Sequence, residues 1–91
     1  MTSSFEDQDR VQDVTFSHDE MTVLLIDGRK ITVPLWWYPP LFQATPEQRA
    51  NWQPCANRRG IHWPDIDEDL DVKGFLIGAK APNAKEPIPA E

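Results

Sequence analysis

The sequence contains a single cysteine, Cys55, and no apolar run that approaches the roughly 18–20 residues of a membrane-spanning helix. A lone cysteine cannot close an internal disulfide, so packing alone must hold the fold, which is typical of proteins in a reducing compartment. The first residues are acidic, whereas a secretory signal is basic and then apolar. We therefore expect a cytoplasmic protein that does not enter a membrane.

Basic residues are also scarce. Nine lysines and arginines stand against fifteen aspartates and glutamates, for a net charge of −6. Affinity for DNA or RNA comes mostly from basic side chains on phosphates, so direct nucleic-acid binding is not expected. The negative charge leaves open a cationic partner, a metal ion, or mimicry of nucleic acid.

The length of 91 residues leaves room for one small domain. A chain of this size buries only about 60–65% of the surface that its unfolded form exposes, so each large aromatic in the core matters. We expect residues 11–78 to form the domain. Residues 1–10 are expected to be a flexible leader and residues 79–91 a flexible, proline-rich tail, because neither has the apolar periodicity of a folded segment.

The clearest local pattern is a β-hairpin. Two β-rich runs, Met21–Ile26 and Arg29–Leu35, flank the dipeptide Asp27-Gly28, which favours a type I′ turn. The second run alternates apolar and polar residues, as a strand with one buried face does. The run Val11–Phe16 predicts a further strand before the hairpin.

Helix signals follow the hairpin. Thr45 and Gln48 form a capping-box pattern around a proline at the first helical position, so a helix is predicted from there to about Trp52. Asp71 is placed to cap a last helix over residues 72–77, and Gly78 occupies its C-cap position. A brief helical turn is expected at 41–44, and short strands at 53–56 and 61–63. We predict an α+β domain: an antiparallel sheet with two short helices packed on one face.

Four segments together resemble a family of small bacterial proteins known as domain of unknown function twenty-four forty-two. They are Asp-Gly-Arg at 27–29, Val-Pro-Leu with the following aromatics and prolines at 33–40, Ala-Thr-Pro-Glu-Gln-Arg at 44–49, and Gly-Ile-His-Trp-Pro-Asp-Ile-Asp-Glu-Asp-Leu at 60–70. The resemblance covers residues 11–78. It implies a compact α+β fold with a curved antiparallel sheet and a bacterial or phage origin.

The same resemblance bears on function. Some relatives carry a helix-turn-helix domain after this one, and others are encoded beside a small basic partner of toxin-like appearance. No catalytic residues are established for the family, so the resemblance assigns none to this chain.

Five carboxylates follow the Trp63-Pro64 pair within seven residues: Asp65, Asp67, Glu68, Asp69 and Asp71. Their alternation suggests a metal loop, but a calcium loop starting at Asp65 needs glycine and glutamate where the chain has Leu70 and Leu76. We favour the alternative that Asp67, Glu68, Asp69 and Asp71 gather at the N-terminus of the last helix and stabilise its amides and dipole. A solvated acidic face and a partner-binding surface both remain compatible with that arrangement.

His62 is the candidate general base, and a dyad can be drawn with Cys55 or Asp65. No nucleophile motif or phosphate-binding loop accompanies it. In a strand His62 faces away from Ile61 and Trp63, so a position at the rim of the surface is favoured. Cys55 is expected to be a small, buried or half-buried apolar residue.

The aromatic residues are too many for all of them to fill so small a core. We expect most of them to pack the sheet against the helices, and Trp37 and Tyr38 to be the exposed ones. The candidate partner-binding residues are Trp37, Tyr38, Trp63, Asp65, Asp67, Glu68, Asp69 and Asp71. The sequence thus predicts a non-enzymatic interaction or regulatory protein without cofactors, in its most concrete form an antitoxin-like neutraliser of a basic protein. Two alternatives stay open: an acidic inhibitor that competes with nucleic acid for a protein target, and an enzyme or sensor dependent on a divalent metal. The oligomeric state is left open.

Overall fold

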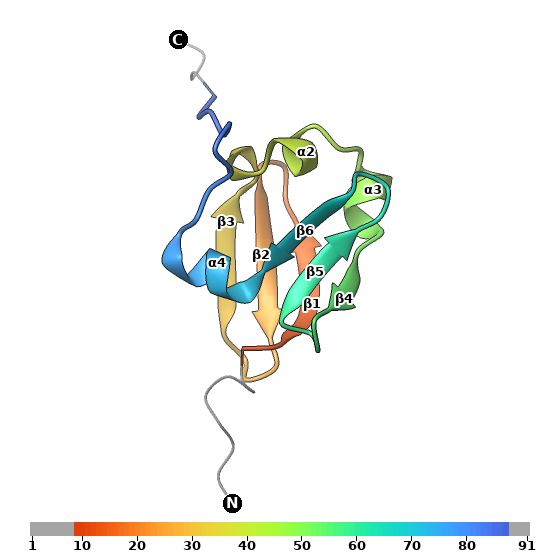
Figure 1. The fold of residues 1–91 in the computed structure, drawn as a ribbon, viewed down its shortest axis with the longest axis vertical. Helices are drawn as coiled ribbons and strands as arrows, with labels where there is room; N and C mark the ends of the chain where they lie inside the picture. Colours follow the sequence, from red (N-terminus) through yellow and green to blue (C-terminus); the bar gives the residue numbers. More distant parts are fainter. Residues whose placement is uncertain (1–8, 88–91) are drawn as a thin grey trace, which may run out of the picture.

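The computed structural model describes residues 9–87 and contains two three-stranded antiparallel sheets (Figure 1). The first sheet comprises β1 (Val11–Phe16), β2 (Glu20–Leu25) and β3 (Lys30–Pro34), in that order. The second comprises β4 (Gln53–Cys55), β5 (Gly60–Trp63) and β6 (Glu68–Asp71), also in chain order. Each sheet is therefore a simple meander.

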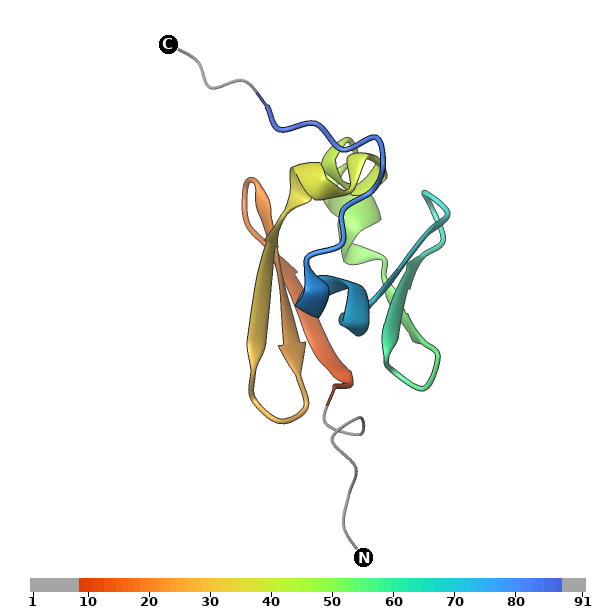
Figure 2. The same ribbon diagram turned by 60° about the vertical axis from the view of Figure 1, so that its left-hand side comes forward.

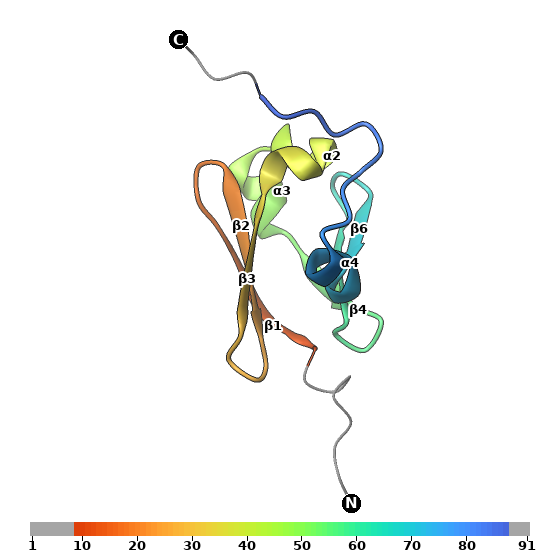
Figure 3. The same ribbon diagram turned by 90° about the vertical axis from the view of Figure 1, so that its left-hand side faces the viewer.

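Short helices join and flank the sheets. The 3₁₀ turn η1 (Leu35–Trp37) and the helices α2 (Pro39–Phe42) and α3 (Pro46–Ala50) connect β3 to β4, and α4 (Val72–Ile77) follows β6. The two sheets face each other, α2 and α3 close one end of the gap between them (Figure 2), and α4 contacts both β3 and β6 (Figure 3). No helix within residues 9–87 is long and apolar enough to cross a membrane.

The predicted α+β class and antiparallel pairing are confirmed, and the arrangement differs in two details. The strands form two sheets instead of one, and three α-helices lie at an end and a side of the pair instead of two on a single face. The helices α2 and α3 occupy the connection between the sheets because the chain must cross from β3 to β4 there, and α4 follows β6.

The β2–β3 hairpin is confirmed, but its turn differs from the predicted type I′. The Gly28 N–H donates to the Leu25 carbonyl at 3.0 Å, and the Leu25 N–H donates to the Arg29 carbonyl at 2.8 Å. This closing pair leaves a three-residue loop in which Gly28 has a φ of 97° and Asp27 does not have a positive φ. The Asp27 carboxylate stabilises the loop by accepting from the Arg29 backbone N–H at 3.1 Å and from its guanidinium at 2.7 Å.

A bulge in β1 allows this strand to bury two residues that are three positions apart. The register against β2 shifts between Val11 and Asp13. Because of this shift both Val11 and Val14 face the core, although strict alternation would place them on opposite sides.

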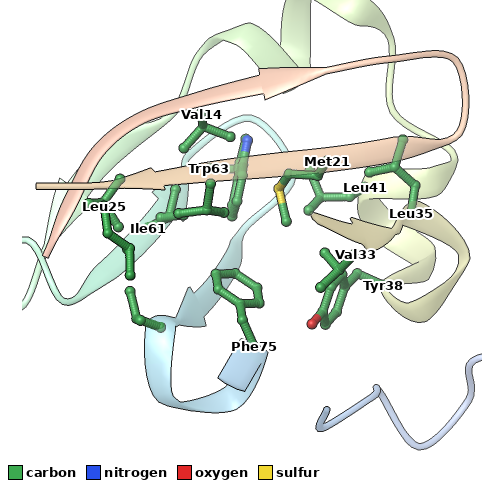
Figure 4. Packing of buried hydrophobic residues seen from close by; sticks show 13 residues of the cluster. Val14, Met21, Leu25, Val33, Leu35, Tyr38, Leu41, Ile61, Trp63 and Phe75 are labelled. Atoms are coloured by element: carbon green, nitrogen blue, oxygen red, sulfur yellow. The ribbon is translucent and has the colours of Figure 1, made fainter. Parts of the chain in front are cut away.

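The hydrophobic core lies between the two sheets (Figure 4). Its largest fully buried side chain is Trp63, whose indole N–H donates to the Arg49 carbonyl at 3.0 Å. Both sheets contribute to the core: its buried members are Val11, Val14, Met21, Val23, Leu25, Val33, Leu35, Tyr38, Leu41, Ile61, Trp63, Val72 and Phe75. The indole therefore reaches from β5 across the gap to the helical connection.

The packed region extends beyond the predicted boundary at Gly78. The Ala81 N–H donates to the Trp37 carbonyl at 3.0 Å, and Lys80 Nζ lies 5.4 Å and 5.6 Å from the ring centroids of Trp36 and Trp37. The first part of the predicted tail is thus held against Trp36 and Trp37, which we call the aromatic turn. Residues 1–8 of the predicted leader and 88–91 of the predicted tail lie outside the described residues.

Candidate functional site

The acidic run forms a turn and an edge strand. The turn occupies residues 64–67 after Trp63, and Asp67 has a φ of 53°, which aspartate tolerates better than most residues. Glu68 to Asp71 then pair with β5 as β6. The prediction that Asp67, Glu68 and Asp69 gather at a helix N-terminus is therefore wrong, because pairing with β5 places Leu70 opposite Ile61 and against the core.

Asp71 alone has the predicted capping role. Its Oδ1 accepts a hydrogen bond from the Gly74 N–H at 2.7 Å, and α4 begins at Val72. The helix ends at Gly78, whose φ of 73° is the left-handed C-cap conformation. Both ends of this helix agree with the sequence prediction.

The side chains of β6 alternate between the two faces of its sheet. Glu68 is opposite the buried Trp63, and it is half-buried, whereas Asp69 is exposed and lies opposite His62. His62 Nδ1 lies 2.6 Å from Asp69 Oδ1, and 30% of its side chain is exposed. The predicted rim position of His62 is confirmed, and its carboxylate partner is Asp69, not Asp65.

An open groove of about 540 Å³ lies along β6, and we call it the acidic groove. One side consists of β6 with Glu68, Asp69 and Asp71, and segment 79–81 forms part of the other. Tyr38 and Phe75 line it between these sides, with their rings edge to face at a centroid distance of 6.0 Å. Figure 4 shows these two rings side by side. The groove thus combines carboxylates with an aromatic wall.

Burial and like charges shift the pKa values of the groove. Burial raises the pKa of Glu68, and the nearby carboxylates of Asp69 and Asp67 raise it further. Burial, with smaller contributions from Glu68 and Asp71, raises the pKa of Tyr38 to about 12. Both raised pKa values mean that the ionised forms of Glu68 and Tyr38 are disfavoured in the groove when no cation is bound there.

Cys55 also lines the groove, but it is poorly suited to nucleophilic attack. Burial and then the charge of Asp69 raise the pKa of its thiol, so the reactive thiolate is disfavoured. The half-buried position predicted for Cys55 is confirmed.

The structure brings together some of the predicted partner-binding residues and separates others. Tyr38 is only 3% exposed, so its predicted exposure is wrong, because the ring packs against Phe75 in the core. Trp63 is 0% exposed and offers no contact surface. Trp37 is half-buried, and Asp65 accepts from Asn51 Nδ2 at 3.0 Å outside the groove lining.

Three features of the groove were missed by sequence reasoning. Phe75 was assigned only to a helix, and Lys80 and Ala81 were assigned to the tail. The signal that points to Lys80 is the preceding pair of tryptophans, since a lysine stacks readily on exposed indole faces.

The carboxylates of the run do not converge as metal ligands. Adjacent residues of β6 point to opposite faces, so Glu68 and Asp69 diverge. Within residues 9–87 no group of three or more histidine, cysteine, aspartate or glutamate side chains is arranged to hold a metal ion.

A family model described as "Protein of unknown function (DUF2442)" matches residues 11–81. The chain belongs to this family. The resemblance predicted from the four sequence segments is confirmed, and the DUF2442 match ends at Ala81, the last residue of the packed segment beside the groove.

Two solved structures have the fold of this DUF2442 chain. A crystal structure of a protein of unknown function from Rhodospirillum rubrum has a TM-score of 0.70 and 22% identity, and the match covers 82% of this chain and 93% of that one. A solution NMR structure of an uncharacterized protein from Chromobacterium violaceum has a TM-score of 0.69 and 18% identity, covering 81% of this chain and 70% of that one. Among curated proteins none matches the chain.

Proposed function

We propose that this protein is a non-enzymatic binding module of the cytoplasm that recognises a basic protein through the acidic groove. In its most concrete form it is an antitoxin-like neutraliser of that partner. The observation that carries the proposal is the placement of Glu68, Asp69 and Asp71 along one side of an open groove. A basic segment of a partner that lies along β6 would meet Asp69 and Asp71 on one face of the strand and Glu68 on the other.

The charge balance around the groove supports this proposal. The ion pairs of Arg29 with Asp9 and Asp27 lie at the β2–β3 turn, away from the groove lining. Within the groove, three carboxylates line the wall with one lysine, Lys80, and the Asp69 carboxylate contacts the His62 imidazole. Negative charge at a groove attracts a basic protein over distance and raises its association rate, and this attraction falls as salt rises.

The half-buried Glu68 adds a reason for affinity. Its carboxylate is partly desolvated and lies near like charges, which raises its pKa. A docked cation would offset both effects and favour the ionised form. Binding should therefore weaken as the pH falls through the pKa of Glu68. Because the ionised form is favoured in the complex, binding in that pH range should release protons.

Affinity capture tests the proposal with a variant that removes charge and keeps shape. The triple variant Glu68→Gln/Asp69→Asn/Asp71→Asn neutralises the three carboxylates of the groove with near-isosteric amides, and asparagine at position 71 can still cap α4. Wild type should retain a basic protein from a lysate of the source organism, and added salt should release it. The triple variant should lose it.

A matched control removes the same charge elsewhere. The variant Asp19→Asn/Glu20→Gln/Glu86→Gln also neutralises three carboxylates, all of them exposed and none of them in the groove lining. This control should capture the basic protein as wild type does. Recovery of the same proteins in equal amounts by all three forms would refute the proposal, because the groove carboxylates would then not govern binding. Equal loss of the basic protein from both variants would also refute it, because net charge and not the groove would then govern binding.

The two alternatives from the sequence have direct tests. An acidic inhibitor would occupy a nucleic-acid site, so DNA or RNA would displace it from the captured protein. A metal-dependent enzyme or sensor would gain thermal stability from millimolar calcium or magnesium, because any ligand that prefers the native state stabilises it.

A further inference from the structure

We propose that the partner adds an extended basic strand to the free edge of β6. This inference rests on the proposed function and specifies how the acidic groove is used. Backbone hydrogen bonds along β6 would bind the added strand, and the carboxylates of the groove would favour a strand with basic side chains.

β6 is an edge strand with its outer side available. The second sheet has the order β4-β5-β6, so β6 has a neighbour on one side. The Val72 N–H donates to the Arg59 carbonyl at 2.9 Å and thus points toward the β5 side. Because backbone groups in an antiparallel strand alternate in direction, the N–H groups of Asp71 and Asp69 point to the free edge.

The acidic groove lies along this edge. Its lining includes Glu68 and Leu70, which face the core side, and also Asp69 and Asp71, which face the solvent side. The groove therefore contacts both faces of β6, and it extends across the sheet to Gly60 of β5 and Cys55 of β4. The four residues of β6 span roughly 13 Å, which is enough for a few backbone hydrogen bonds with an added strand.

The charge of β6 determines what kind of strand fits. A second copy of the chain would place acidic residues against acidic residues, and charged side chains on edge strands oppose such self-pairing. A strand with lysine or arginine at alternate positions would meet Asp69 and Asp71 on the solvent face. Its other residues would face Glu68 and the aromatic wall, so apolar side chains or a further lysine suit them.

A pair of substitutions at one position separates strand addition from simple charge attraction. Asp69→Ala removes one carboxylate and keeps the backbone N–H. Asp69→Pro removes the same carboxylate and also the donor at the free edge, and proline is tolerated where an edge N–H faces solvent. The probe is an acetylated and amidated octapeptide of alternating lysine and valine, and its dissociation constant is measured by calorimetry at low salt.

Asp69→Pro should weaken peptide binding about tenfold more than Asp69→Ala, since a backbone hydrogen bond is lost and the incoming strand is obstructed. Equal weakening by both variants would overturn strand addition. Circular dichroism tests whether both variants fold. If Asp69→Pro does not fold, strand addition is tested instead by the binding of two peptides to the wild-type protein. The two peptides have the same charge and the same number of N-methyl groups.

Each of the two peptides carries N-methyl groups on alternate backbone amides. One peptide has them on the odd-numbered amides and the other on the even-numbered amides. A strand that pairs along one edge loses about tenfold in affinity when its inward amides are methylated and little when its outward amides are. If the two methylated peptides bind the wild-type protein with equal affinity, strand addition is overturned. Failure of the unmodified peptide to bind at millimolar concentration would overturn it as well. The capture experiment with the neutralised variant remains the separate test of the proposed function.

Sedimentation of the wild-type protein alone tests the competing occupant. A monomer at high concentration agrees with an edge kept open by repulsion. A dimer that Asp69→Pro dissociates and Asp69→Ala does not would assign the edge to a second copy of the chain and overturn the proposal of a basic partner.

Discussion

Tyr38 makes the stability of the protein depend on alkaline pH in a measurable way. Its phenol is 3% exposed, and burial raises its pKa to about 12, whereas a tyrosine in an unfolded chain titrates near about 10. The folded protein therefore holds the neutral phenol more strongly than the unfolded chain does. The contribution of the neutral phenol to the free energy of unfolding is complete below about pH 10. It is lost as the pH rises from about 10 to about 12.

The size of this effect follows from the two pKa values. A difference of about 2 units corresponds to about 2.7 kcal/mol when ionisation is complete, and about 1.9 kcal/mol of it is lost by about pH 11.5. Urea unfolding of wild type and of Tyr38→Phe at about pH 8 and 11.5 measures the loss. Phenylalanine keeps the ring packing against Phe75 and cannot ionise, so titration of other groups is common to both proteins.

The chain has a single tyrosine, so the ultraviolet absorbance of tyrosinate reports Tyr38 alone. The midpoint of this absorbance change should lie at about pH 12 in the folded protein and at about pH 10 in urea. A folded-state midpoint near the unfolded value would refute the reasoning. The same conclusion would follow if Tyr38→Phe lost as much stability at high pH as wild type.

Three further changes have expected outcomes in equilibrium unfolding. Asp71→Ala should cost about 1 kcal/mol because it removes the N-cap of α4, and Asp71→Asn should cost much less; equal losses would argue against the cap. Ala56→Gly should stabilise the protein by up to about 1 kcal/mol because Ala56 has a φ of 51°, whereas Ala50→Gly within α3 should destabilise it. Trp63→Phe should cost about 1–3 kcal/mol through lost volume and an unpaired Arg49 carbonyl, and an unchanged midpoint would contradict the packing around the indole.

Local signals in the sequence predicted local structure well. The capping box of Thr45 and Gln48 and the cap at Asp71 depend on atoms three residues apart, so the chemistry of one short segment is enough to specify them. The hairpin position follows from Gly28 for the same reason. The exact turn was not predictable, because the closing pair depends on how β2 and β3 align over their full length.

The sequence by itself determined the family, the α+β class, the caps and the acidic character of residues 65–71, since each of these depends on residue types and short spacings. Only the tertiary structure decided that Glu68 to Asp71 form a strand, that Tyr38 is buried, and that segment 79–81 packs on the aromatic turn. An acidic tetrapeptide has little strand preference of its own, and its pairing with β5 supplies the hydrogen bonds that decide its conformation. The acidic groove exists because distant segments meet there, and no local pattern specifies which distant segments meet.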